Sequence, residues 1–128
     1  MIKNHTKHLK PQTTLYHYSG EEKKIMVAAI YSTFDNIEDA RRIAATLVEE
    51  QLVACVNIIP NIESTYRWKG KIENTQEIAI IAKTTDSNVK KTITRIKQLH
   101  NYELPDIIVL PIIGGLKEYL DYITNETT

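Results

Sequence analysis

Residues 53–84 read VACVNIIPNIESTYRWKGKIENTQEIAIIAKT, and this stretch decides the fold. Its centre, Lys69-Gly70, predicts a tight turn, because glycine tolerates the positive φ that a two-residue hairpin needs. The flanking segments 63–68 and 71–84 are rich in β-branched and aromatic residues, which predicts the two strands of a hairpin. If the second strand is continuous it spans about 45 Å, more than the roughly 35 Å width of such a domain, so we expect its overhang to pair with a neighbouring chain.

The segments that precede the hairpin predict a strand, a helix and another strand. Residues 53–59 form an apolar run typical of a strand, and Pro60 is expected to end it because proline cannot donate a ladder hydrogen bond. Residues 25–31 predict an earlier buried strand. The segment from Asp35 to Glu38 resembles a capping box and predicts a helix start. The apolar residues that follow share one helical face: Ile37, Ala40, Ile43, Ala44, Leu47 and Val48.

The segments that follow the hairpin predict a helix, a strand and a short terminal helix. The first helix is expected to start with Asp86 or Ser87 as N-cap and to end before Pro105. Residues 106–112 predict a β-branched strand, which Gly114-Gly115 is expected to break. The helical spacing in the two helices rests on Val89, Ile93, Ile96 and His100, and on Leu116, Leu120 and Ile123.

This order of elements defines a fold class. The arrangement β-α-β-β-α-β with an extra C-terminal helix predicts an α+β, ferredoxin-like sandwich, in which two helices cover one face of a four-stranded antiparallel sheet. The other face is left without a cover, yet Ile78–Ala82 and Ile107–Leu110 are apolar at consecutive positions and so on both faces. Another copy of the same chain is the economical cover, and the sequence therefore predicts a homo-oligomer.

Composition and charge exclude several classes of protein. The 128 residues suffice for one domain with a hydrophobic core. Lys plus Arg and Asp plus Glu each total 16, so the chain lacks the basic excess that nucleic-acid binding needs. No apolar run reaches the roughly 18 residues that a membrane span needs. The single cysteine, Cys55, excludes an internal disulfide and suits a reducing cytoplasm. Residues 1–24 are polar and aperiodic, which predicts a flexible N-terminal extension before a domain of residues 25–128.

Three motifs become specific in combination. They are ACVNIIP at residues 54–60, YRWKGKIE at residues 66–73 leading to Lys83-Thr84, and HNYELPDII at residues 100–108. In this order and spacing they resemble the CutA family, the divalent-ion tolerance proteins, over residues 26–123. The resemblance implies a fold related in architecture to the PII signalling proteins, assembled as a tight homotrimer whose sheets face one another and whose hairpin arms pair across subunits.

The resemblance also implies a function. It points to a non-enzymatic protein of divalent-cation tolerance, chiefly for copper, with no obligatory cofactor and weakly bound copper or zinc; in eukaryotic relatives it implies anchoring of other proteins. Nothing in the sequence resembles a Ser-His-Asp triad or a paired-carboxylate site, so we expect no catalytic residue. An alternative stays open: a PII-like sensor whose inter-subunit clefts bind a small anion through Lys83 and Arg67. The tight Lys69-Gly70 turn, which leaves no long loop between the strands, stands against it.

Three side chains are candidate metal ligands: His100, Cys55 and Glu103. His100 and Glu103 lie at a predicted helix end and in the loop beside it, where imidazole and carboxylate can reach a metal from solvent, and imidazole suits both Cu(II) and Zn(II). Helix capping explains His100 equally well. Cys55 lies within an apolar strand, where a free cysteine acts as a small buried hydrophobe or as a ligand that must first be exposed. We expect metal binding to depend more on His100 than on Cys55.

A second group of residues is expected in an inter-subunit cleft: Tyr66, Arg67, Trp68, Lys83 and Tyr102. Tyr66 and Trp68 share one face of the hairpin arm, as interface anchors or as rings on which a ligand stacks. Lys83 ends an apolar strand, and its ammonium needs a partner. Glu73 or Glu77 can supply that partner across an interface, and an anionic ligand is the alternative.

Overall fold

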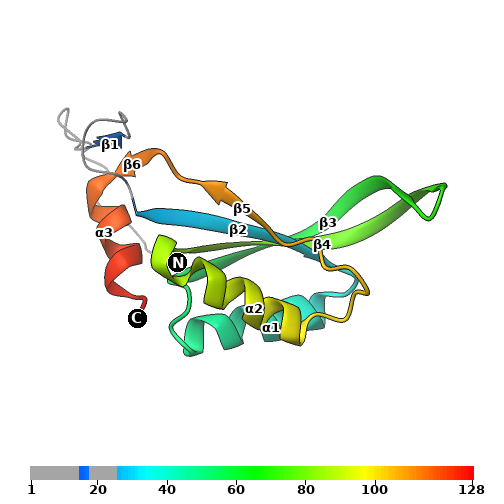
Figure 1. Ribbon diagram of the computed structural model, residues 1–128, viewed down its shortest axis with the longest axis horizontal. Coiled ribbons are helices and arrows are strands. Elements are labelled where there is room, and N and C mark those ends of the chain that lie inside the picture. Colours follow the sequence, from blue (N-terminus) through cyan, green and yellow to red (C-terminus); the bar gives the residue numbers. More distant parts are fainter. Residues whose placement is uncertain (1–14, 18–25) are drawn as a thin grey trace.

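The computed structural model describes residues 15–17 and 26–128 of the chain (Figure 1). Most of the predicted N-terminal extension, residues 1–24, therefore lies outside the described residues. Its described part, β1 (Leu15–His17), pairs antiparallel with β6 (Gly114–Leu116). The sequence pattern did not predict this pairing, and Gly114-Gly115, expected to break a strand, forms part of one.

The body of the molecule is a four-stranded antiparallel sheet in the order β3-β4-β2-β5. Two helices, α1 and α2, cover one face of this sheet, as Figure 1 shows. The bounds are β2 (Val27–Phe34), α1 (Ile37–Glu49), β3 (Cys55–Trp68), β4 (Lys71–Thr85), α2 (Val89–Leu99), β5 (Ile108–Pro111) and α3 (Lys117–Asn125). The predicted α+β, β-α-β-β-α-β order with an extra C-terminal helix is confirmed.

The expected end of a strand at Pro60 is wrong, because β3 continues through it to the hairpin turn. The pairing of β3 with β4 shifts register between Ile59 and Ile62, and Asn61 has a φ of 60°. Three residues of β3 thus advance against two of β4, which is a β-bulge. A bulge leaves its extra residue out of the ladder, so the missing N–H of proline costs no hydrogen bond there.

The predicted hairpin is confirmed, including its turn. Lys69 and Gly70 have φ values of 50° and 82°, and two consecutive positive φ values match the twist of the flanking strands. The second strand, β4, is continuous over 15 residues. The half of β3 that precedes the turn and the half of β4 that follows it extend beyond the body of the molecule as a two-stranded arm (Figure 1).

The first helix begins where the sequence predicts. Asn36 is its N-cap, and the Asn36 side chain accepts a hydrogen bond of 2.8 Å from the backbone N–H of Asp39. Its buried residues are Ala40, Ile43, Ala44 and Leu47, whereas Val48, predicted on the same face, is exposed. The second helix begins later than predicted, because a 3₁₀ turn over Asp86–Asn88 precedes it.

The main core lies between the sheet and the two helices. Its fully buried side chains include Ile30, Phe34, Ile43, Leu47, Ile80 and Ile96. Because side chains alternate along a strand, the odd-numbered residues of β2 point to the opposite side, together with the residues paired to them. We call this other side, which α1 and α2 do not cover, the open face.

One end of the open face is closed by α3. Leu120 and Ile123 of this helix pack on Val27 and Ala54 in a second, smaller cluster. The rest of the open face carries the outer strand β5, whose four residues are all exposed. Among the described residues, no helix has both the length and the apolar character to cross a membrane. The open face therefore has one covered end and one uncovered end.

Candidate functional site: an acidic aromatic cavity

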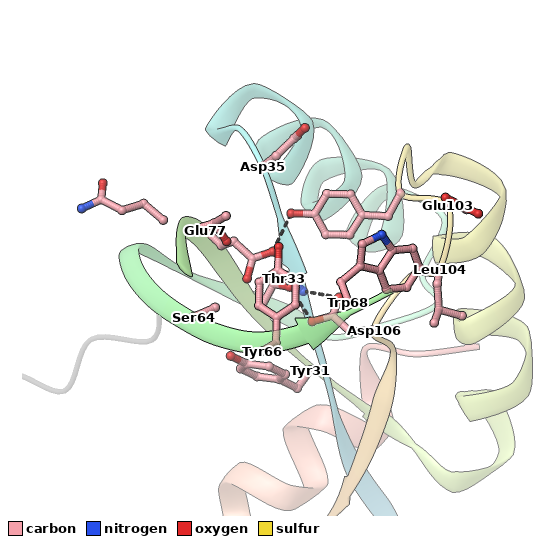
Figure 2. A pocket seen from close by; sticks show the side chains of 13 residues that line it. Tyr31, Thr33, Asp35, Ser64, Tyr66, Trp68, Glu77, Glu103, Leu104 and Asp106 are labelled. Carbon is pink, nitrogen blue, oxygen red and sulfur yellow. Dashed lines mark hydrogen bonds between the residues drawn. The ribbon is translucent and has the colours of Figure 1, made fainter. Parts of the chain in front are cut away.

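A cavity of about 590 Å³ lies at the uncovered end of the open face, where the arm leaves the body (Figure 2). It is bounded by β2, by the parts of β3 and β4 that form the arm, as far as Trp68 beside the turn, and by the loop that connects α2 to β5. Four aromatic residues line it: Tyr31, Tyr66, Trp68 and Tyr102. Four carboxylates line it as well: Asp35, Glu77, Glu103 and Asp106. No Lys, Arg or His belongs to the described residues that line it.

Glu77 is the buried carboxylate of the cavity, with 8% of its surface exposed. The hydroxyl of Tyr102 donates to its Oε2 at 2.6 Å, and the hydroxyl of Thr33 lies 3.2 Å from the same oxygen. The other oxygen, Oε1, accepts no hydrogen bond from the described residues. Charged hydrogen bonds of this kind are stronger than neutral ones, so Tyr102 is held firmly against Glu77.

Thr33 links Glu77 to Asp106. The backbone N–H of Thr33 donates to Asp106 at 3.1 Å, and the Thr33 hydroxyl contacts the second oxygen of the same carboxylate (Figure 2). A threonine hydroxyl carries a single proton, so it donates to Glu77 or to Asp106 but not to both at once. Two carboxylates therefore share one hydroxyl donor, and no ion pair to either is found among the described residues.

Burial and the acidic environment raise the pKa values of two tyrosines in the cavity. Burial, and next the hydrogen bond to Glu77, raise the pKa of Tyr102 far above its ordinary value. Burial, followed by the charges of Asp106 and Glu77, also raises the pKa of Tyr31. Both phenols therefore stay neutral and keep their protons at physiological pH, and the cavity has a negative potential.

His100 has a structural place beside the cavity. Its ring stacks on Phe34 with centroids 4.3 Å apart, on the helix-covered side of the sheet. Its Nε2 lies 2.8 Å from the carbonyl oxygen of Thr33, and its Nδ1 accepts the backbone N–H of Tyr102 at 3.2 Å. A carbonyl can only accept, so Nε2 carries the proton and both ring nitrogens are engaged. His100 thereby positions Thr33 and Tyr102, the two residues whose hydroxyls contact Glu77.

Cys55 and Lys83 lie together at the other end of the open face. They are partners across β3 and β4, and both reach Tyr119 of α3. The Lys83 ammonium donates to the Tyr119 hydroxyl at 3.2 Å and lies 5.2 Å from the centre of its ring. The sulfur of Cys55 is 3.4 Å from the same hydroxyl. Burial and the contact with Cys55 raise the pKa of Tyr119 above its ordinary value.

The predicted metal ligands are therefore not gathered into one site. Cys55 is buried by α3, His100 lies on the other side of the sheet, and Glu103 lies exposed at the rim of the cavity, 3.9 Å from Lys69. Among the described residues, no three His, Cys, Asp or Glu side chains are placed to hold one metal ion. A resident metal bound by this chain alone does not fit these residues.

The predicted cleft residues divide in the same way. Tyr66, Trp68 and Tyr102 line the cavity, whereas Arg67 and Lys83 do not. Within one chain, Lys83 donates to the hydroxyl of Tyr119, and its pairing with Glu73 or Glu77 across an interface stays a prediction.

Sequence reasoning missed Thr33, Asp106 and Tyr31 as site residues. Thr33 and Asp106 are 73 positions apart and meet only because β2 and β5 are neighbours in the sheet. The only available signal was the alternation of side chains along a strand: Glu77 is an even number of positions from Lys83 and therefore lies on the same face of the strand. This alternation identifies a face but not what gathers on it.

The fold and the site together define a small α+β protein with a ferredoxin-like sheet and an acidic, aromatic cavity beside a long hairpin arm. The chain belongs to the family of CutA1 divalent ion tolerance proteins, whose model matches residues 28–126. The resemblance found in the three sequence motifs is thereby confirmed.

Relatives of known name support this membership. The chain is 44% identical over 102 residues to the divalent-cation tolerance protein CutA of Thermus thermophilus, covering 80% of this chain and 99% of that one. It is 38% identical to a chloroplastic protein CutA of Arabidopsis thaliana, covering 82% of this chain and 58% of the relative. The relative from Arabidopsis is therefore considerably longer than the matched region.

Solved structures agree with the fold. The Thermus thermophilus protein superposes with a TM-score of 0.78 at 44% identity, covering 80% of this chain and all of that chain. CutA from Synechococcus elongatus superposes with a TM-score of 0.81 at 28% identity, covering 91% of this chain and 97% of that chain.

Proposed function

We propose that this CutA-family protein is a non-enzymatic homotrimer of PII-like architecture that binds divalent cations, copper first, and serves in the response to them. The names of its relatives describe tolerance of divalent cations and no reaction. The observation that carries the proposal is the uncovered, apolar part of the open face. We further propose a cytoplasmic location, which the single, unpaired Cys55 supports.

The apolar surface of β5 supports the assembly. Ile108 and Leu110 pair with Tyr31 and Ala29 and share the open face with them; they are 52% and 40% exposed. β5 is also an edge strand, with one side unpaired among the described residues. An exposed, apolar edge strand is a liability that an assembly removes. Three copies with their open faces together, and the arm of each on the edge of the next, cover both features.

Metal binding in this proposal is weak and shared between subunits. His100, Cys55 and Glu103 remain the proposed ligands, with copper or zinc as the ion. Each has a competing contact: His100 with Thr33, Cys55 with Tyr119, and Glu103 with Lys69. A binding ion has to displace such a contact, which lowers affinity. Three-fold symmetry compensates by bringing one ligand from each of three chains to a shared position.

One experiment tests assembly and metal binding together. Ile108→Asp places a charge in the proposed interface, and Val48→Asp places the same charge on an exposed part of α1. We expect light scattering to give three chain masses for the wild type and for Val48→Asp, and a lower mass for Ile108→Asp. In calorimetric titration with Cu²⁺, Ile108→Asp should lose the heat of binding that the other two proteins show.

Each outcome bears on one part of the proposal. A wild-type chain that is monomeric at micromolar concentration contradicts the trimer. A monomeric Ile108→Asp that binds Cu²⁺ as the wild type does contradicts ligands shared between subunits.

A second candidate function is a PII-like small-ligand sensor, or a trimer that anchors another protein. The cavity favours the sensor over the anchor, because it is concave and of the size of a small-molecule site. Its lining does not suit the anion that Lys83 and Arg67 were expected to bind.

A further inference from the structure

We propose that a groove between α2 and the turn that follows α1 binds an acidic peptide segment of a partner protein, with carboxylates of the peptide on Lys90 and Lys91. The groove lies on the helix-covered side of the sheet, opposite the open face (Figure 1). In the proposed assembly the open faces meet, so this side points outward and stays accessible. The inference therefore goes beyond copper binding and applies to a single chain and to a trimer alike.

The first observation is the composition of the groove. It has a volume of about 380 Å³ and is lined by Leu52, Lys90, Lys91, Thr94, Arg95 and Gln98. None of these described lining residues carries a carboxylate. The exposed residues of α2 are all basic or neutral and polar, and the helix has no Asp or Glu from Val89 to Leu99. The surface is therefore positive, although the whole chain has a formal net charge of zero.

The second observation is that two of the three cations in the groove have no ion pair. Arg95 is neutralised, because its Nε and Nη2 donate to the two carboxylate oxygens of Glu50 at 2.9 and 2.8 Å. Lys90 and Lys91 form no ion pair with the described residues. Both ammonium groups can therefore receive a carboxylate from outside the chain.

The third observation is the place of the two lysines in α2. They lie in its first turn, where the partial positive charge of a helix N-terminus disfavours cations, and no acidic residue lies in that turn. The charges of Lys90 and Lys91 are thus unfavourable to the helix, and no ion pair with the described residues compensates for them. A local rule that is broken without compensation is typical of a functional position.

The groove is held in shape by contacts behind it. The backbone carbonyl of Leu52 accepts the hydroxyl of Thr84 at 2.6 Å and the side-chain amide of Asn88 at 3.1 Å. Arg95, which also lines the groove, is held by its two hydrogen bonds to Glu50. A preformed groove lowers the entropic cost of binding a segment of another chain.

The spread of the donors favours a peptide over a single small anion. The lining runs from Lys90 to Gln98, which is about 12 Å along the helix at 1.5 Å per residue. A phosphate is held best by donors that converge on one point, whereas an extended peptide advances about 3.3 Å per residue and presents carboxylates and carbonyls over this length. The Thr94 hydroxyl, which makes no hydrogen bond to the described residues, and the Gln98 amide nitrogen add neutral donors for such carbonyls.

The test measures the fluorescence anisotropy of fluorescein-labelled hexaglutamate in the presence of the full chain. Labelled hexaglutamine, which has the same length and no charge, is the matched peptide. We expect saturable binding of one hexaglutamate per chain and no binding of hexaglutamine. The affinity should fall as NaCl rises from about 50 to about 300 mM, because salt screens exposed charges.

Variants assign the binding to the groove, and they are needed because residues 1–24 hold five lysines that also attract acidic peptides. The double variant Lys90→Gln, Lys91→Gln should bind hexaglutamate at least about fivefold more weakly. The matched control is Arg41→Gln, Lys97→Gln, which removes two exposed charges outside the groove. This control should bind within about twofold of the wild type.

A charge-reversed variant separates a role in binding from a role in folding. Lys90→Glu, Lys91→Glu places carboxylates in the first turn of α2, where they are favourable to the helix, so its urea midpoint should be no lower than that of the wild type. Its affinity for hexaglutamate should be lower than that of the glutamine variant. Loss of binding without loss of stability would show that the two lysines serve a partner rather than the fold.

Several results would overturn the proposal. Equal binding of hexaglutamate and hexaglutamine, or equal losses in the two glutamine double variants, would show attraction that is not specific to the groove. Displacement of the peptide by lower concentrations of tripolyphosphate would assign the groove to a small anion, and displacement by phosphatidylserine vesicles would assign it to a membrane. Ile108→Asp, which tests assembly, should bind hexaglutamate as the wild type does, so the failure of one proposal is distinguishable from the failure of the other.

Discussion

The two ends of the open face use similar residues in opposite ways. At the covered end, Lys83 and Cys55 meet Tyr119 under α3, so the chain supplies both the cation and the cover. At the uncovered end, Glu77 and Asp106 meet aromatic rings without a cation from the described residues and without a helix above them. The difference shows that the chain completes one end of this sheet face by itself and leaves the other end uncovered.

The largest expected effect concerns the cover. Ile123 of α3 is 1% exposed in the smaller cluster, so Ile123→Ala leaves a cavity and should lower the free energy of unfolding by about 2–5 kcal/mol. Urea denaturation measures the change. Val48→Ala, on the exposed side of α1, should stay within about 0.5 kcal/mol of the wild type. If the two variants unfold alike, α3 does not close its end of the face and the comparison fails.

A smaller effect is expected at the uncovered end. Tyr102→Phe removes the hydroxyl that donates to Glu77 at 2.6 Å, and it should lower the free energy of unfolding by about 1–2 kcal/mol. Tyr66→Phe is the matched control, because its hydroxyl makes no hydrogen bond to the described residues. Equal stability of the two variants in urea would show that the network around Glu77 does not hold the cavity together.

The smallest effect is a dependence on alkaline pH. The pKa of Tyr102 is raised in the folded protein, so its contribution to stability is complete below the ordinary tyrosine pKa of about 10. Above that pH the unfolded chain loses the proton first, and stability falls as pH rises toward the folded pKa. We expect the urea midpoint to fall between about pH 9 and 11 and to fall less in Tyr102→Phe. Parallel curves would exclude Tyr102 as the source.

Much of the fold could be predicted because its signals are local. The positive φ of Lys69 and Gly70, the cap at Asn36 and the apolar spacing of α1 each depend on residues within one or two turns of chain. Pro60 misled because a local rule, that proline ends a strand, was overridden by a bulge that only the partner strand defines. β1 was missed because its partner, β6, is nearly one hundred positions away.

The candidate site was only partly predictable. Tyr66, Trp68, Tyr102 and Glu103 were named from the motifs and do line the cavity. His100 was interpreted as a metal ligand or, equally well, as a helix cap. Its engagement by Thr33 and Tyr102 follows from the position of β2, which its own segment does not encode.

By itself, the sequence determined the order of the β-α-β-β-α-β elements, the hairpin, the family and the existence of an apolar face without a cover. These features are readable because periodicity and short motifs lie within one segment of the chain. Only the tertiary structure decided which polar groups meet. Thr33 and Glu77 lie on two paired strands and Asp106 lies in the loop that leads into a third, so their meeting depends on sheet order and register. Lys83 donates to Tyr119 of a helix that follows it by more than thirty residues. Electrostatic and hydrogen-bond contacts act over a few ångströms in space, so a site is specified only when the packing of distant segments is known.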